Sequence, residues 1–202
     1  MFENYQNGWA SRFYFDGHFR KEATKILPGE YYVTTNDMVL VTVLGSCVAA
    51  CIRDRRKEIG GMNHFMLPEY IQDDVELFSS SARYGIYAME VLINHLMMLG
   101  AHRDDLEAKV FGGGNVINSL SKTNIGQRNA HFVLKFLRTE RIPIAAQDLT
   151  DVYARKVYYF PKTGKVMVKK LHSLRNETIF EREKNYGQRL RRVKPGEIEL
   201  FT

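Results

Sequence analysis

Apolar residues in the first third of the chain gather into short runs that predict strands. MVLVTV (38–43) and CVAACIR (47–53) are rich in Val and small apolar residues, as in strands buried on both faces. A polar turn at 54–59 separates the second run from GGMNHFML (60–67), which we expect to be a third strand that ends at Pro68. We therefore predict three consecutive buried strands in this region.

The hydrophobic period changes to that of a helix after residue 79. Apolar residues in 79–100 recur on one helical face, and Gly100 stands where a helix-terminating glycine is common. A second helix is predicted from about Gly126 to Arg141. Further strand-like runs are AKVFGGGN, IPIAAQD, RKVYYF and KVMVKKL, with PKTG joining the last two as a hairpin. Two helices against about seven strands predict an α+β sandwich in which the helices cover one sheet.

Three segments are expected along the chain. Residues 1–25 are aromatic and polar without a clear period, and we expect a loosely attached N-terminal extension. The domain itself is predicted over 26–171, followed by a basic tail at 172–202 that is helical in part. The 202 residues, 45% of them hydrophobic and 26% charged, have an ordinary globular composition that is enough for one core.

Charge narrows the expected partners. Lys and Arg total 29 against 23 Asp and Glu, a net charge of +6, with much of the excess late in the chain. No RNA- or DNA-binding motif accompanies this charge, so we do not expect a nucleic-acid partner. The tail is expected to lie in solvent or to meet an acidic protein surface or anionic lipid.

The sequence also bears on location. No run approaches the roughly 18 apolar residues that span a bilayer, and we expect no integral membrane segment. The start, MFENYQNGWASRFYF, lacks the basic and apolar regions of a secretory signal, so a cytoplasmic protein is expected. Cys47 and Cys51, if extended, would lie about 13 Å apart, too far for a disulfide. Both are expected to be free thiols.

The corner LGSC contains the candidate chemistry. A reactive thiolate needs a nearby base, and His64 on the next strand can supply one to Cys47. Gly45 and Ser46 leave room for a carbonyl, and main-chain N–H groups there can face its developing oxyanion. Thr42, on the preceding strand, can accept a hydrogen bond from the imidazole and orient it.

A packing interpretation stands beside the catalytic one. A free cysteine in an apolar run is commonly a buried small hydrophobe, and we expect this of Cys51. A zinc site from Cys47, Cys51 and His64 is disfavoured by the ligand spacing. FGGGN (111–115) lacks the lysine of a phosphate-binding loop, so a tight turn is favoured over a lining for a substrate cleft.

The chain resembles a known family at these residues. LGSCVAACIRD and IGGMNHFMLP resemble the signature of the chemoreceptor glutamine deamidases, the CheD family. Five later segments follow in the family's order, so the resemblance covers about residues 26–171. These segments are RYGIYAMEVLINHLMMLGA, KVFGGGNV, IGQRNAHFVLKFL, IPIAAQDL and RKVYYFPKTGKVMVKKL.

The resemblance implies an activity and a fold. Members hydrolyse glutamine side chains of methyl-accepting chemotaxis receptors to glutamate and ammonia through a thioester, without a metal or cofactor. It implies Cys47 as nucleophile, His64 as general base and acid, and Thr42 as third member. The residues expected to bind the oxyanion or the substrate are Gly45, Ser46 and Asn63. The implied fold is a mixed, largely antiparallel β-sandwich with two main helices outside, layered α/β/β, similar to the catalytic domain of cytotoxic necrotizing factors.

One departure and two alternatives remain. Some members place the threonine six residues before the cysteine, whereas Thr42 is five before Cys47. A one-residue shift turns a strand side chain to the other face unless a bulge absorbs it. One alternative function is that of a non-catalytic binding partner of a CheC-like chemotaxis phosphatase. The other is that of a cysteine protease or transglutaminase-like enzyme that uses the same Cys-His pair.

Overall fold

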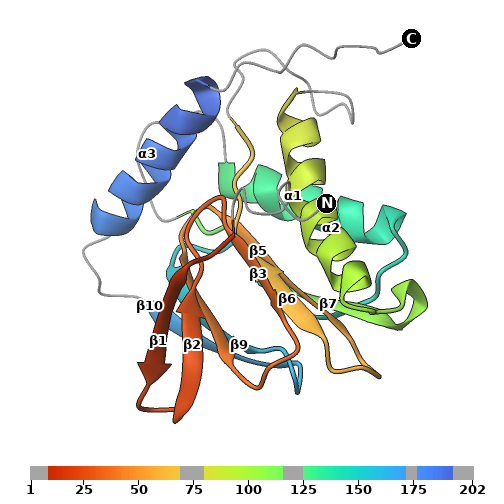
Figure 1. The fold of residues 1–202 in the computed structure, drawn as a ribbon. Coiled ribbons are helices and arrows are strands. Elements are labelled where there is room, and N and C mark those ends of the chain that lie inside the picture. Colours follow the sequence, from red (N-terminus) through yellow and green to blue (C-terminus); the bar gives the residue numbers. More distant parts are fainter. Residues whose placement is uncertain (1–8, 69–79, 116–124, 172–176, 193–202) are drawn as a thin grey trace.

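Two stacked five-stranded sheets form the centre of the molecule (Figure 1). The computed structural model describes residues 9–68, 80–115, 125–171 and 177–192. The first sheet, in spatial order, consists of β1 (Arg12–Asp16), β2 (Lys21–Lys25), β4 (Val39–Leu44), β9 (Ala154–Phe160) and β10 (Lys165–Leu171). The second consists of β3 (Tyr31–Thr34), β6 (Gly60–Asn63), β5 (Val48–Asp54), β7 (Leu106–Gly112) and β8 (Ile144–Leu149).

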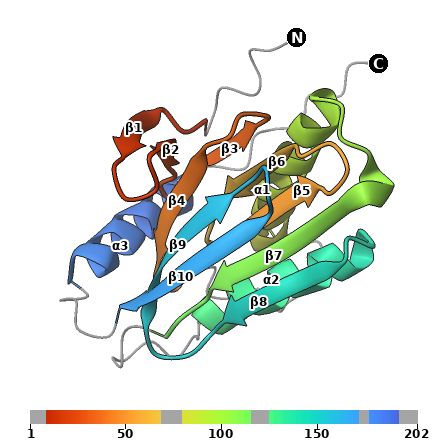
Figure 2. The ribbon, with the colours of Figure 1, turned by 90° about the horizontal axis from the view of Figure 1, so that it is seen from below.

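The layers agree with the predicted fold class. Among the described strands, β2 with β4 and β7 with β8 pair in parallel, and the other pairings are antiparallel. Helices α1 (Ser80–Met98) and α2 (Ile125–Thr139) pack on the second sheet, against β3, β5, β6 and β7 (Figure 2). The α/β/β sandwich is therefore confirmed.

Strand β5 is buried on both faces, which explains its small side chains. Val48, Ala50 and Ile52 face the core beneath α1 and α2, whereas Ala49 and Cys51 face the core between the two sheets. This alternation follows from the two-residue period of a strand. The side chains on both faces are fully or almost fully buried, so small apolar residues suit a strand enclosed between two layers.

The expectation that residues 1–25 are loosely attached is wrong for the second half of this segment. Strands β1 and β2 pair with each other, and β2 joins the first sheet beside β4. Four of the five residues of β1 are exposed, including Phe13, Tyr14 and Phe15, so no inward and outward alternation marks this strand in the sequence.

The helix ends agree with the sequence pattern. Gly100 follows α1 with a φ of +97°, and Ala101 N–H donates to Leu96 O, as in a glycine-terminated helix. The predicted helical part of the tail is α3 (Glu177–Arg192), which lies across one end of the sandwich (Figure 1). Within the described residues, no helix is both long and apolar enough to cross a membrane.

Candidate active site

The corner formed by residues 45–47 is where the chain passes from β4 in the first sheet to β5 in the second. The glycine loop after β7 holds two of its carbonyl groups. Gly113 N–H donates to Cys47 O at 2.7 Å, and Gly114 N–H donates to Gly45 O at 2.8 Å. The glycine run therefore fixes the corner of the candidate site.

A buried asparagine holds the third carbonyl of the corner. Asn129 of α2 is fully buried; its Nδ2 donates to Ser46 O at 2.8 Å, and its Oδ1 accepts from Leu67 N–H at 2.9 Å. The sequence interpretation missed this residue. Its signal was a polar side chain on the inner stripe of the helix, beside Ala130 and in line with Val133.

The three N–H groups of the corner converge on one carboxylate, that of Glu183 in α3. Gly45 N–H and Cys47 N–H both donate to Oε1 at 3.0 Å. Ser46 N–H donates to Oε2 at 2.9 Å, and the Ser46 hydroxyl donates to the same oxygen at 2.6 Å. Successive N–H groups aimed at one point form an anion-binding concavity. Gly45 and Ser46, which are predicted to bind the oxyanion, thus donate to the carboxylate of Glu183.

Thr42 and His64 meet across the two sheets. The Thr42 hydroxyl donates to Ile26 O at 2.7 Å and lies 2.8 Å from His64 Nδ1. Because the hydroxyl hydrogen is used by Ile26, the second contact requires Nδ1–H to donate to Thr42 Oγ1. His64 Nε2 then carries the lone pair of a base. The β4 pairing is regular, so Thr42 faces His64 without a bulge.

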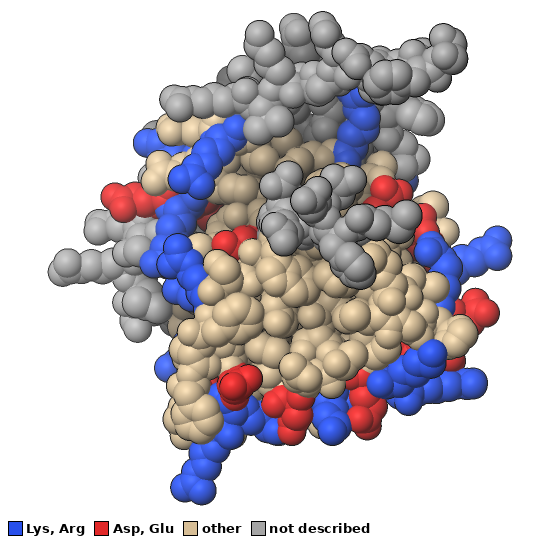
Figure 3. Space-filling model, viewed as in Figure 1, with Lys and Arg blue, Asp and Glu red and all other residues tan. Residues whose placement is uncertain are grey.

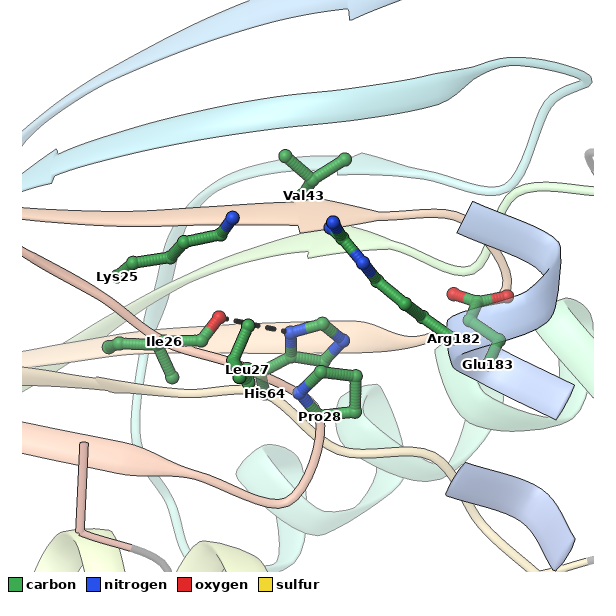
Figure 4. Close-up of a pocket in the computed structure, with 8 residues that line it drawn as sticks. All are labelled: Lys25, Ile26, Leu27, Pro28, Val43, His64, Arg182 and Glu183. Atoms are coloured by element: carbon green, nitrogen blue, oxygen red, sulfur yellow. Dashed lines mark hydrogen bonds between the residues drawn. The ribbon is translucent and has the colours of Figure 1, made fainter. Parts of the chain in front are cut away.

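The position of His64 is fixed by its own backbone. His64 N–H donates to Glu30 O at 2.9 Å, and its carbonyl accepts from Gly29 N–H at 2.7 Å. The imidazole lines a small pocket next to α3 (Figure 4). The residues around this pocket are Lys25, Ile26, Leu27, Pro28, Val43, His64, Arg182 and Glu183.

Cys47 and His64 lie on the same face of the β5–β6 pair. Val48 bridges Phe65, which places the two preceding residues at diagonal positions, with Cα atoms on the order of 7 Å apart. His64 Nε2 is buried and, among the described residues, has no hydrogen-bond partner. The thiol and the imidazole are therefore neighbours that are not in hydrogen-bond contact.

Both groups are kept neutral in this arrangement. Burial raises the pKa of the Cys47 thiol well above its usual range, and the charge of Glu183 and its hydrogen bond with the thiol raise that pKa further. Burial lowers the pKa of His64 to about 4, against an opposing effect of Glu183. A fully buried thiol with a raised pKa is a poor nucleophile until its surroundings change.

Asn63 is not brought to the site, contrary to the expectation. Strand alternation turns its side chain toward α1, on the opposite face from His64. Its Oδ1 accepts from Ala50 N–H at 2.9 Å, and its Nδ2 donates to Ala88 O at 3.0 Å. Asn63 thus links β5, β6 and α1 and does not line the anion site.

Two further expectations concern the thiols and metal ions. Cys51 packs in the core between the sheets, as predicted, and both cysteines are free. In the part of the chain that the structure describes, no three His, Cys, Asp or Glu side chains are grouped so that they could hold a metal ion.

Comparison with known proteins identifies one family. The CheD family, described as "CheD chemotactic sensory transduction", matches residues 66–170. A probable chemoreceptor glutamine deamidase CheD from Dechloromonas aromatica is 60% identical, with 98% of both chains covered. Proteins with the same description from Janthinobacterium sp. and Methylobacillus flagellatus are 56% and 58% identical, covering 100% and 95% of this chain and 100% and 96% of their own.

Proposed function

The chain belongs to the CheD family, and on that premise we propose how it deamidates glutamine side chains of chemoreceptors to glutamate. Relatives that are named for this activity align with the chain over almost their whole length. The site contributes a thiol, an imidazole in a defined tautomer and a set of converging N–H donors. These are the groups that hydrolysis of a primary amide through a thioester requires.

Cys47 is the nucleophile and His64 the base. When a glutamine side chain is bound, His64 Nε2 takes the thiol proton and Cys47 Sγ attacks the δ-carbon of the carboxamide. Thr42 keeps the proton of the ring on Nδ1, so that Nε2 is the nitrogen that accepts. Thr42 acts through His64 and is a positioning residue.

The corner stabilises the tetrahedral intermediate. Gly45 N–H and Cys47 N–H meet at a single carboxylate oxygen in the structure, and the oxygen of a substrate amide fits the same position. The imidazolium then protonates the leaving nitrogen, and ammonia departs from the thioester. A water molecule deprotonated by His64 hydrolyses the thioester to glutamate. The convergence of these two donors beside Cys47 is the observation that carries the mechanism.

Mass spectrometry of receptor peptides tests this mechanism. Wild-type protein is expected to replace the side-chain NH₂ of particular glutamines by OH, with ammonia released and chain length unchanged. Cys47→Ala and His64→Gln are expected to abolish the change, whereas Cys51→Ala, a control at the other buried thiol, retains it. Deamidation that persists in Cys47→Ala would contradict the mechanism, and cleaved or cross-linked products would favour the protease or transglutaminase alternative.

We expect the protein to act in the cytoplasm, on the cytoplasmic part of membrane receptors. A CheC-like phosphatase is the second partner that the family resemblance implies, and binding without deamidation would favour the purely regulatory alternative.

A further inference from the structure

Helix α3 covers the candidate site with a single stripe of residues. Glu183 and Leu190 are buried, and Tyr186 and Gly187 are partly buried. The positions 183, 186, 187 and 190 follow the spacing of one helical face. The residues between them are exposed, and Lys and Arg side chains line the α3 side of the molecule (Figure 3). One acidic side chain therefore lies on the inner face of a helix whose outer face is basic.

Three parts of the site receive this inner face. The Tyr186 ring packs on Gly29, where an added Cβ would lie 2.9 Å from the ring. The Tyr186 hydroxyl is hydrogen-bonded to the Tyr84 hydroxyl of α1. An added Cβ at Gly187 would lie 3.2 Å from Met66 Cε. Helix α3 is thus seated on the β2–β3 loop, on α1 and on the segment that follows His64.

Glu183 presents the product of the proposed reaction. It is a glutamate side chain projecting from a helix, and its two oxygens use all three N–H groups of the corner. Gly45 leaves space for the Glu183 carboxylate, because a Cβ added at residue 45 would lie 3.0 Å from both carboxylate oxygens. Oε1 takes the place proposed for the amide oxygen, and Oε2 accepts from the N–H and the hydroxyl of Ser46, as the second oxygen of a glutamate product can.

The docked helix also suppresses the nucleophile. Cys47 has no exposed surface. A glutamine side chain cannot share the three donors while Glu183 holds them, and the negative charge opposes ionisation of the neighbouring thiol. Occupancy of the site and deactivation of its nucleophile therefore have the same cause.

We propose that α3 is an autoinhibitory helix that holds the site in a product-like state, and that a receptor helix must displace it before glutamine reaches Cys47. This inference rests on the proposed function. Only the fraction of molecules with α3 undocked binds substrate, so docking raises KM by the inverse of that fraction and leaves kcat unchanged. A helix that served only to stabilise the fold would produce no such division between KM and kcat.

Alkylation of Cys47 tests the docked helix without any substrate. In a Cys51→Ala background, only Cys47 can react with iodoacetamide. Glu183→Ala is expected to raise the rate of alkylation at neutral pH by about tenfold or more. The hydrogen bonds to the charged Glu183 side chain keep α3 docked, and the variant loses them. Glu181→Ala removes the same charge from the exposed side of the same helix and is expected to react like the parent. A parental rate in folded Glu183→Ala overturns the proposal.

Receptor deamidation kinetics separate this proposal from the proposed function. Glu183→Ala is expected to lower KM by about tenfold or more with kcat unchanged. Leu190→Ala weakens the packing of α3 away from the corner, and it is expected to lower KM as well. If Glu183→Ala does not fold, Leu190→Ala carries both measurements. A fall in kcat with KM unchanged overturns autoinhibition. Faster alkylation with no deamidation by any variant refutes the proposed function instead, and unchanged alkylation with Cys47-dependent deamidation refutes autoinhibition alone.

Discussion

At the scale of single residues, the site depends on where one hydroxyl proton points. Thr42 gives its hydrogen to Ile26 O and therefore can only accept from His64. Threonine carries no charge, so its contribution is orientation and tautomer selection without the electrostatic support that a carboxylate gives an imidazolium. It suits a histidine whose pKa is already lowered by burial, because that histidine is neutral when it begins to act as a base.

Replacement of Thr42 tests this orientation. Thr42→Val keeps the shape but leaves His64 Nδ1–H only the longer contact with Ile26 O at 3.5 Å, and kcat for receptor deamidation is expected to fall about 10- to 100-fold with little change in KM. Thr42→Ser retains the hydroxyl and is expected to restore most of the rate. Thr24→Val is a matched control at another fully buried threonine of the first sheet. Equal kcat values for Thr42→Val and wild type would show that the tautomer is fixed by other means.

Glu183→Gln converts the inhibitory side chain into a possible substrate. The introduced carboxamide is expected to be hydrolysed by the same molecule: Cys47 Sγ displaces ammonia from its δ-carbon, and water hydrolyses the thioester and restores Glu183. The peptide 171–184, released by a lysine-specific protease, reports the conversion, and fragmentation separates position 183 from Asn176.

The double variant Glu183→Gln with Cys47→Ala is the control and is expected to keep its carboxamide. Survival of the carboxamide in the single variant, while Cys47 still deamidates receptors, contradicts the assignment of the Glu183 position as the carboxamide position.

At the scale of elements, the corner is held by other segments of the chain. The loop after β7 and helix α2 bind its three carbonyl groups, which leaves its three N–H groups aligned. This arrangement is preorganised, because the donors face one point without needing to move during the reaction. Gly112, the last residue of β7, must be glycine because of a close contact: its φ is +108°, and an added Cβ would lie 2.2 Å from Cys47 O.

Gly112→Ala is expected to destabilise the protein through this contact. The clash with main chain and the left-handed φ together are expected to lower the free energy of unfolding by at least about 1–3 kcal/mol, measured by urea denaturation. Gly17→Ala is the matched control, because an added Cβ there meets nothing within 4 Å. Equal stability of the two variants would mean that the corner relaxes around the new methyl group.

The elements predicted from the sequence are those whose burial leaves a periodic pattern. Strands β4 and β5 and helices α1 and α2 each bury at least one face, so their periods are visible. Strand β1 is exposed on both faces, and the inner stripe of α3 includes a glutamate and a glycine, so neither pattern indicates a packed element.

The site divides in the same way. Cys47, His64 and Thr42 lie within 23 residues of one another and share a local signature. Glu183 is 136 residues away from Cys47, and only the tertiary fold relates it to the corner. Asn63 shows the converse error, since it stands next to His64 in sequence but on the other face of the strand.

At the scale of the whole molecule, the site is assembled from both sheets and helix α2, with α3 docked over it. Thr42 comes from the first sheet and His64 from the second, so their contact exists only while the two sheets are packed together. Asn129 of α2 completes the corner, Glu183 of α3 occupies it, and Tyr84 ties α1 to α3. Catalytic geometry and global stability are therefore coupled, and a buried neutral histidine makes that coupling depend on pH.

Stability is expected to fall between about pH 6.5 and about pH 4 because of His64. Its pKa is about 4 when buried in the folded protein, against 6.5 as its ordinary value. Above pH 6.5 the ring is neutral in both states; as the pH falls, the unfolded chain takes up a proton first and is stabilised. The loss of stability approaches about 3 kcal/mol at the acid end of this window.

Urea denaturation at several pH values tests this effect. The free energy of unfolding is expected to depend less steeply on pH for His64→Gln than for wild type. His131→Gln, at an exposed position on α2, should retain the wild-type slope. Parallel curves for all three proteins would mean that folding does not lower the pKa of His64, which would contradict the effect of burial described here.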